Sequence, residues 1–348
     1  MLNIQTIYTE LDSKYSECGR DIISRYPNAA VKIISSHNNV QELNDSALAS
    51  KWNLIKDSVL VLGTKKGLTF TENGRSSDFI GTSIANGCAS ACNYCYVARR
   101  KGYVNPITIF TNIDEIITAY LEHAEKLGVK KQSNQCDPTK WVYDIGCNND
   151  ISIDAMVSNN PKKLIESFAN VSNAKLSFAT KTVNKDLLNY DHNGNTRIRF
   201  SIMPPNIAKV VDIRTSPIID RLEAVNDFVS AGYEVHLNIS PVIIYDNWQN
   251  DYKRLLMMVD DILTDEAKDQ LACEIIFLTH NVDLHELNLL WHPKGEDLLW
   301  KPALQENKTS LMGGDNIRYK YKEKSQYLSL LEGMIDHYNP YMTVRYAF

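Results

Sequence analysis

The sequence predicts an α/β protein whose central part is an incomplete, TIM-like (β/α)6 barrel. Three observations support this fold class. Between residues 79 and 280, short runs rich in β-branched or aromatic residues alternate with stretches of helical periodicity. Strands that alternate with helices form right-handed βαβ units and a parallel sheet. A cysteine-rich loop directly follows the first of these strands, and loops at the carboxyl ends of barrel strands carry the functional residues in such folds.

The chain divides into three predicted segments. Residues 1–75 form a small N-terminal α/β segment, residues 76–282 form the partial barrel, and residues 283–348 form a C-terminal hairpin and helix extension. The elements expected outside the barrel are a helix near Leu11–Tyr26, strands at Ala30–Ile34 and Ser58–Gly63, a hairpin within Lys308–Tyr321, a helix at Ser325–Tyr338 and a strand at Thr343–Ala347.

Six strands are expected in the barrel, each a short apolar run. The clearest helix lies between the first two strands, where Asn112 is a plausible N-cap and Gly128 a plausible C-cap. The predicted strands are Phe79–Ile84, Trp141–Gly146, Leu176–Thr180, Arg197–Ile202, Glu234–Ile239 and Cys273–Thr279. The later crossover helices are expected at Pro161–Ala169, Ile219–Ala231 and Asp251–Asp265.

Composition excludes some classes of protein. The 348 residues are 44% hydrophobic and 23% charged, which is compatible with a sizeable core and not with wholesale disorder. No apolar run has the length of a membrane span, and the N-terminus lacks the pattern of a secretory signal, so a cytoplasmic protein is expected. The net charge of −5 does not indicate nucleic-acid binding, although a local basic face would suffice for it.

Three cysteines form the most informative motif. Cys88, Cys92 and Cys95 have the spacing C-x3-C-x2-C, with no fourth cysteine close by. Thiolates anchor the irons of a 4Fe–4S cluster, so three anchors leave one iron open for chemistry. A zinc site usually has a second pair of ligands, and a disulfide framework is typical of short secreted chains. The trio therefore favours a cluster whose open iron binds S-adenosylmethionine.

The chain resembles the spore photoproduct lyase family, whose members are radical S-adenosylmethionine enzymes that reverse a thymine-dimer lesion in DNA. The likeness runs almost from end to end and includes the cluster loop. Its other motifs are Ser36-His37-Asn38 with Val40, Leu60-Val61-Leu62-Gly63-Thr64-Lys65-Lys66, Cys147-Asn148-Asn149-Asp150, Thr180-Lys181, His192-Asn193-Gly194-Asn195-Thr196-Arg197-Ile198-Arg199-Phe200-Ser201-Ile202, Ala231-Gly232-Tyr233, Ser240-Pro241-Val242 and Trp248.

The resemblance implies an activity, cofactors and partners. The activity is a carbon–carbon lyase that converts the spore photoproduct, 5-thyminyl-5,6-dihydrothymine, to two thymines through a 5′-deoxyadenosyl radical. The cofactors are a 4Fe–4S cluster held by Cys88, Cys92 and Cys95, and S-adenosylmethionine. The partners are damaged DNA and an electron donor such as a flavodoxin or ferredoxin, and no membrane is expected.

The resemblance also implies two catalytic residues. Cys147 matches the family's thiol hydrogen donor and is expected at the carboxyl end of the second barrel strand. Without the resemblance, a small buried hydrophobic residue is the favoured interpretation, and the strand-end location and the matching motif reverse that preference. Tyr96 resembles a tyrosine thought to pass the radical onward, and the alternative is a ring packed beside the cluster.

Four further residues resemble positions that hold the cofactor. Tyr94 is the aromatic residue that usually lies along the adenine. Lys181, at the end of the third strand, matches a partner for the methionyl carboxylate. Ser201, in the fourth strand, matches a hydrogen-bonding partner of the ribose or amino-acid part. Asn149 stands where the family usually has a serine, and its amide can make similar contacts.

The predicted hairpin departs from the family pattern. The family has an Arg-Tyr pair there that wedges into the duplex, and here Arg318-Tyr319 is the available pair but comes later in the hairpin. This departure leaves two alternatives open. One is a related radical enzyme that acts on a different DNA or RNA lesion or base. The other is a non-catalytic iron–sulfur protein that binds nucleic acid.

Overall fold

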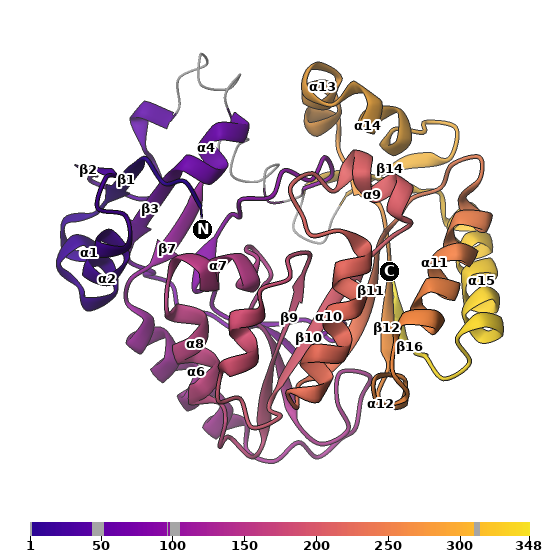
Figure 1. The fold of residues 1–348 in the computed structure, drawn as a ribbon, viewed down its shortest axis with the longest axis horizontal. Helices are drawn as coiled ribbons and strands as arrows, with labels where there is room; N and C mark the ends of the chain where they lie inside the picture. The colour runs from indigo at the N-terminus through magenta and orange to yellow at the C-terminus, as the bar shows by residue number, and fades with distance from the viewer. Residues whose placement is uncertain (1, 44–51, 96, 98–104, 310–313) are drawn as a thin grey trace. The chain divides into compact units, whose positions relative to one another are not determined.

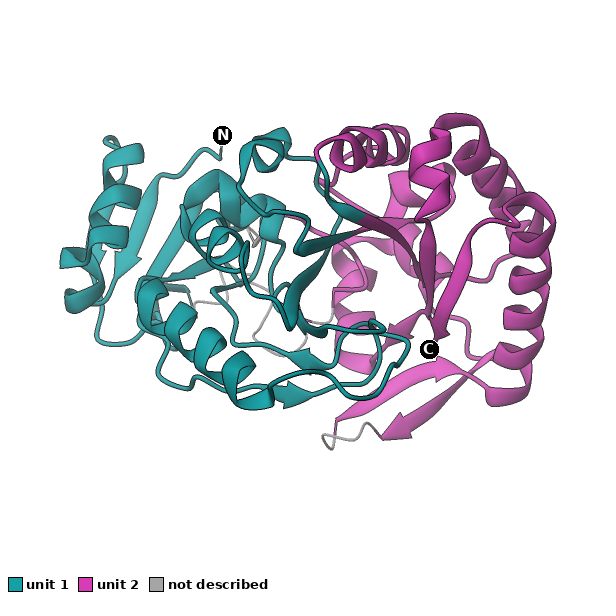
Figure 2. Cartoon of the chain, turned by 90° about the horizontal axis from the view of Figure 1, so that it is seen from below, with its two compact units in different colours: residues 1–89, 100–198, 232–234 teal, residues 90–99, 199–231, 235–348 magenta. Residues whose placement is uncertain are grey.

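The computed structural model describes residues 2–43, 52–95, 97, 105–309 and 314–348 of the chain. These residues form two compact units, coloured separately in Figure 2. The first unit consists of Met1–Ala89, Arg100–Ile198 and Gly232–Glu234, and the second of Ser90–Arg99, Arg199–Ala231 and Val235–Phe348. The units do not follow the three predicted segments, whose boundaries stay a prediction.

The central sheet confirms the predicted half-barrel. Its strands are ordered β16-β12-β11-β10-β9-β8-β5-β4, so the six predicted barrel strands are neighbours in chain order. The pairs β5–β8, β8–β9, β11–β12 and β12–β16 are parallel, and β4 joins antiparallel at one edge. The bounds are β4 Thr71–Glu72, β5 Phe79–Ile80, β8 Trp141–Asp144, β9 Ala174–Thr180, β10 Thr196–Ile202, β11 Glu234–Val242, β12 Ala272–Phe277 and β16 Thr343–Ala347.

In β10, polar and apolar side chains alternate along the strand. Polar Arg197, Arg199 and Ser201 alternate with apolar residues, and every residue of the strand is buried. Successive side chains of a strand point to opposite faces, so β10 has one apolar and one polar buried face. Buried charge requires a partner. Arg199 accordingly pairs with the fully buried Glu274 of β12 at 3.0 Å.

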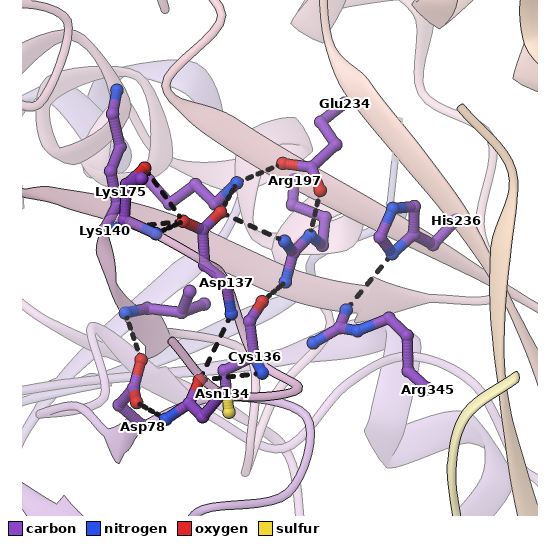
Figure 3. Close-up of polar contacts among 12 residues, drawn as sticks. Asp78, Asn134, Cys136, Asp137, Lys140, Lys175, Arg197, Glu234, His236 and Arg345 are labelled. Carbon is purple, nitrogen blue, oxygen red and sulfur yellow. Dashed lines mark hydrogen bonds and ion pairs between the residues drawn. The ribbon is translucent and has the colours of Figure 1, made fainter. Parts of the chain in front are cut away.

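Arg197 belongs to a buried ion network in the first unit (Figure 3). Its Nε donates to Glu234 Oε1 at 2.6 Å, and one of its terminal nitrogens donates to the carbonyl of Cys136 at 2.8 Å. Lys175 of β9 pairs with both Asp137 and Glu234. The network joins strands β9 and β10 to the loop before β8, because each buried charge is compensated by a neighbour from a different segment.

A second sheet in the first unit has the order β2-β1-β3-β7-β6. β1 pairs in parallel with β2 and β3, β3 pairs in parallel with β7, and β6 joins antiparallel. This sheet is not confined to residues 1–75, because β6 and β7 come from residues beyond 75. The bounds are β1 Thr6–Thr9, β2 Ala30–Ile33, β3 Val59–Gly63, β6 Ala85–Asn86 and β7 Ile107–Phe110.

The single helix expected near Leu11–Tyr26 is wrong, because the structure has two. α1 (Leu11–Tyr15) ends at Ser16, whose extended backbone interrupts the helical hydrogen bonds. The Ser16 side chain then accepts a hydrogen bond from Gly19 N at 2.9 Å and caps α2 (Glu17–Arg25). Gly19 is required there, since an added Cβ would lie 1.9 Å from the carbonyl oxygen of Ser13.

The remaining helices of the barrel region are visible in Figure 1. The predicted helix between Asn112 and Gly128 is confirmed as α6, with Asn112 at its N-cap position, although the Asn112 side chain makes no capping hydrogen bond. The Asn112 side chain instead bonds both backbone groups of Lys65, at 2.9 and 3.0 Å. The bounds are α4 Trp52–Ser58, α6 Ile113–Leu127, α7 Ile151–Val157, α8 Asn160–Ser167, α9 Pro205–Val211, α10 Ile218–Ser230, α11 Trp248–Ile262 and α12 Asp265–Asp269, with 3₁₀ turns η1 Gln41–Leu43 and η2 Lys185–Asn189.

The C-terminal part contains the predicted hairpin, helix and strand. β14 (Gln305–Thr309) and β15 (Asp315–Tyr319) pair antiparallel, and β13 (Thr279–His280) pairs with β15 on its other side. The helices here are α13 (Val282–Trp291), α14 (Pro293–Leu299) and α15 (Tyr321–Tyr338). Among the described residues, no helix is both long enough and apolar enough to cross a membrane.

Candidate active site

In the first unit, Asp150 organises the ends of two neighbouring barrel strands. Its carboxylate caps α7 by accepting from Ser152 N at 3.0 Å. The same carboxylate accepts from Thr180 Oγ1 at 2.7 Å and from the backbone N–H of Lys181 at 3.2 Å, both at the end of β9. Burial raises the pKa of Asp150, and these hydrogen bonds oppose the rise. Asp150 therefore links the loop that carries Cys147 to Thr180 and Lys181 at the end of β9.

Asn149 and Asp154 form a second polar pair beside this loop. Asn149 Nδ2 donates to Asp154 Oδ2, and complete burial raises the pKa of Asp154 well above its usual 3.8. Among the described residues, the buried Asn149 Oδ1 has no hydrogen-bond partner. A buried amide oxygen without a donor is suited to accept from a ligand.

The first cluster cysteine, Cys88, is connected to this loop through the backbone. Gly87 N donates to the carbonyl of Asn148 at 2.8 Å, and Gly87 forms an isolated parallel bridge with Asn149. Gly87 has a φ of 76°, and an added Cβ would lie 2.7 Å from the carbonyl oxygen of Pro106, so glycine is required. The buried ammonium of Lys56 donates to the carbonyl of Cys88 at 3.1 Å.

In the second unit, residues 90–95 are attached along their backbone to the segment that follows α9. Ala91 N donates to Ile213 O at 2.9 Å, and Asn93 N donates to Val211 O at 3.0 Å. The Asn288 side chain of α13 donates to the carbonyl of Asn93 at 2.8 Å. The part of the loop that carries Cys92 and Cys95 is thus fixed by residues far away in the sequence.

Tyr94, between these two cysteines, makes a hydrogen bond to a buried ion pair. Its hydroxyl donates to Asp212 Oδ1, while Asp212 Oδ2 accepts from both terminal nitrogens of Arg221 at 3.1 Å each. Burial, with the nearby Asp212 carboxylate, raises the pKa of Tyr94 well above 10, so the hydroxyl stays protonated. Arg221 also donates to the carbonyl of Ser201 at 2.7 Å.

A buried carboxylate, Glu296, contacts the residue that holds the loop of Cys92 and Cys95. Glu296 of α14 accepts from Asn288 Nδ2 at 2.7 Å and contacts His280 Nε2 at 3.0 Å and His285 Nδ1 at 2.5 Å. Burial alone would raise the pKa of Glu296, but contacts with His280, His285 and Asn288 hold it below 4.5. Asn288 connects this group to the carbonyl of Asn93.

The residue types present match the donor chemistry of the predicted cofactors, although within the described residues no three such side chains are gathered into a metal-binding group. Cys88, Cys92 and Cys95 are half-buried and, like the other cysteines of the chain, form no disulfide within the described residues. Three thiolates are the donor set of a cluster with one open iron. The unpartnered Asn149 Oδ1 offers an acceptor to an ammonium group. Lys181 and Ser201 lie at the ends of adjacent strands β9 and β10.

The remaining predicted site residues have different placements. Tyr96 lies outside the described residues. Tyr319 is buried, with its hydroxyl accepting from Ile244 N at 2.9 Å, and the Arg318 guanidinium lies 4.9 Å from the centre of the Phe348 ring. The geometry gives Tyr319 a packing role in its unit, while residues 310–313 at the turn are not described. That Arg318 and Tyr319 contact nucleic acid stays a prediction.

The Ser36-His37-Asn38 and Gly63-Thr64-Lys65 motifs meet at one carboxylate that the sequence did not reveal. Glu10, directly after β1, accepts from His37 N at 2.9 Å and Thr64 N at 3.0 Å, and contacts His37 Nδ1 at 2.7 Å. Burial raises the pKa of Glu10, but the hydrogen bonds from His37 and Thr64 outweigh it and lower the pKa. These motifs are thus joined at the carboxyl ends of parallel strands.

Comparison with known proteins identifies the family. The family model "Spore photoproduct lyase" matches residues 2–348. The chain belongs to the spore photoproduct lyase family. Within it, the chain is 30% identical to the spore photoproduct lyase of Clostridium acetobutylicum over 260 residues, which is 74% of this chain and 73% of that protein. It is 29% identical to that of Bacillus subtilis over 275 residues, 78% and 77% of the two chains.

Solved structures of spore photoproduct lyases share the fold. A variant with bound AdoMet and dinucleoside spore photoproduct superposes with a TM-score of 0.88 at 21% identity, covering 99% of both chains. A complex with dinucleoside spore photoproduct gives 0.88 at 22% identity, again over 99% of both chains. These likenesses confirm the family's partial barrel from end to end of this chain.

Sequence reasoning found the thiols and strand ends but missed the carboxylates that position them. Asp150 was the one with a visible signal, because it is the last residue of the Cys147-Asn148-Asn149-Asp150 motif. Asp212 and Glu296 had no such signal in the sequence. Asp212 contacts Tyr94, 118 residues away, and Glu296 acts on the loop through Asn288, whose partner Asn93 is 195 residues away. Cys147 and Lys181 are joined through Asp150 in the first unit, and Tyr94 and Ser201 through Arg221 in the second.

Proposed function

We propose that this chain is a radical S-adenosylmethionine lyase that reverses the spore photoproduct in damaged DNA to two thymines. Family membership supports the reaction type. The observation that carries the proposal is the hydrogen bond of Gly87, next to the first cluster cysteine, to the loop that carries Cys147. This bond ties the backbone of the thiol donor's loop to that of a cluster ligand.

Each site residue has a role in this proposal. Cys88, Cys92 and Cys95 hold a 4Fe–4S cluster, and Asn149 Oδ1 and the Lys181 ammonium bind the amino and carboxylate groups of S-adenosylmethionine. When bound, the cluster and S-adenosylmethionine supply the 5′-deoxyadenosyl radical that takes a hydrogen from the lesion. Cys147 returns a hydrogen atom to the product radical, because a thiol S–H bond is weak, and the thiyl radical left on Cys147 is passed onward through Tyr96. A flavodoxin or ferredoxin is the proposed electron donor.

The test is turnover of dinucleoside spore photoproduct by the anaerobically reconstituted protein in D₂O. Thiol hydrogens exchange with solvent, so the expected product is repaired dinucleotide that carries deuterium. Cys147→Ala should still form 5′-deoxyadenosine but return no deuterium from the protein. Cys136→Ala is the matched control, because Cys136 is a buried cysteine whose thiol bonds the carbonyl of Arg75. Formation of 5′-deoxyadenosine without any repair would refute the substrate assignment.

A related lesion or base is the second candidate substrate. It is favoured by the burial of Tyr319, which leaves the described part of the hairpin without the exposed Arg-Tyr pair expected for the family. Inserted side chains help decide which base leaves the stack. Product analysis on oligonucleotides with and without ultraviolet damage separates the two candidates. The second candidate predicts that the enzyme converts a lesion or base other than the spore photoproduct.

A further inference from the structure

The buried pair of Asp212 and Arg221 lies between two residues assigned to cofactor binding. Asp212 follows α9, and Arg221 is in the first turn of α10. Both helices are labelled in Figure 1. On one side, Asp212 accepts the hydroxyl hydrogen of Tyr94. On the other, Arg221 donates to the carbonyl of Ser201. One ion pair therefore joins the aromatic residue of the cluster loop to the end of β10.

Arg221 is buried, and its guanidinium group is surrounded by hydrogen-bond acceptors that compensate its charge. Its guanidinium has 0% exposure and donates to Ser201 O at 2.7 Å, Ser216 O at 2.8 Å and Thr215 Oγ1 at 2.5 Å. Two of its nitrogens also contact Asp212 Oδ2 at 3.1 Å. The planar fork of an arginine can serve all of these acceptors at once, whereas a lysine is a single point of charge.

We propose that Asp212 and Arg221 are positioning residues for S-adenosylmethionine, which fix the Tyr94 ring and the Ser201 segment in place before the cofactor binds. The inference rests on the proposed function, from which it takes the cofactor.

The physical reason is preorganisation. A tyrosine ring held only by packing must lose rotational freedom when a ligand binds against it, and that loss weakens binding. The bond from the Tyr94 hydroxyl to a carboxylate removes this freedom in advance. Bonds to charged groups are stronger than neutral ones, and the two contacts from Arg221 to Asp212 Oδ2 fix the orientation of the carboxylate. Ser201 gains the same benefit through its backbone carbonyl.

The experiment compares S-adenosylmethionine binding by the reconstituted full-length protein and its variants in anaerobic equilibrium dialysis. The variants are Tyr94→Phe, Asp212→Asn, the double variant and Arg221→Lys, with far-UV circular dichroism and iron content measured for each. Tyr341→Phe is the matched control, because the Tyr341 hydroxyl also donates to an aspartate, Asp260, at 3.1 Å. The electron paramagnetic resonance spectrum of the reduced cluster is recorded before and after S-adenosylmethionine is added.

Tyr94→Phe keeps the ring and should retain its iron, yet bind S-adenosylmethionine about tenfold more weakly, as expected for the loss of one charge-assisted hydrogen bond. The loss in the double variant should be smaller than the sum of the two single losses, since both changes act on the same bond. Arg221→Lys should also lose affinity. Tyr341→Phe should bind like the wild type.

Three results would overturn the inference. The first is a Tyr94→Phe variant with wild-type affinity for S-adenosylmethionine and an unchanged spectral response. The second is a double variant whose loss of affinity equals the sum of the two single losses. The third is a loss of iron from the variants that accounts for their weaker binding. Wild-type affinity in Arg221→Lys would remove Arg221 from the assignment. A wild-type protein that holds its cluster but binds no S-adenosylmethionine would refute the proposed function itself, and the inference with it.

Discussion

Replacement of Asp150 by alanine tests whether one carboxylate holds the two catalytic strand ends together. Three donors lose their acceptor: Ser152 N at 3.0 Å, Thr180 Oγ1 at 2.7 Å and Lys181 N at 3.2 Å. Loss of the helix cap costs about 1 kcal/mol. The other two buried donors cost about 1 kcal/mol each when left unpaired.

Part of this cost is offset in the variant. Burial raises the pKa of Asp150, which shows that its charged form is disfavoured in the folded protein despite its hydrogen bonds. Removal of that carboxylate therefore recovers some free energy, and the expected net loss of local stability is about 2 kcal/mol. Asp150→Asn keeps one acceptor oxygen but places an amide donor opposite another donor, so we expect about half of that loss.

Amide hydrogen exchange measured by mass spectrometry provides a local assay. A loss of about 2 kcal/mol should increase exchange about thirtyfold in peptides that cover residues 150–157 and 180–184. Asp186→Ala is the control, because its carboxylate is exposed on the neighbouring turn η2. Exchange in Asp150→Ala within about twofold of the wild type would show that packing alone holds these segments, and would refute the reasoning.

Three further predictions concern acidic residues with internal partners. Burial raises the pKa of Asp154 well above 3.8, so above pH 3.8 the folded state binds more protons than the unfolded state. The free energy of unfolding of the wild type should therefore fall as pH rises above 3.8. Asp154→Asn should lack this fall when urea unfolding is measured at a series of pH values. The pKa of Glu296 lies below 4.5, so its contribution is present above pH 4.5 and is lost on acidification, and Glu296→Gln should flatten that acid loss in thermal melts. Glu234→Gln leaves Lys175 with one fewer partner and should cost about 2 kcal/mol in the same unfolding assay, whereas an unchanged midpoint would assign the pair no net stability.

The sequence by itself determined the features that depend on local pattern. Six short apolar runs were sufficient to locate the six barrel strands, because β-branched and aromatic residues favour strands wherever the chain places them. The spacing of Cys88, Cys92 and Cys95 was sufficient to predict three thiolate anchors, since the ligands lie on one loop. Gly128 ends α6 with a φ of 59°, as predicted from the residue type alone.

Other predictions failed or were silent because the deciding contact cannot be recognised from the residue types. Asn112 has the residue type of an N-cap, but its side chain bonds the backbone of Lys65, which only the pairing of β3 with β7 brings near. The helix break at Ser16 depends on Gly19 and the Ser13 carbonyl, whose close approach no periodicity reveals.

The tertiary structure alone decided how the site residues are held. Lys181 is 31 residues from Asp150, and Tyr94 is 118 residues from Asp212. A buried carboxylate is stable only where donors surround it, and the fold must first bring those donors together. The sequence therefore determined which residues carry the chemistry, and the packing of strands and helices decided which carboxylates position them.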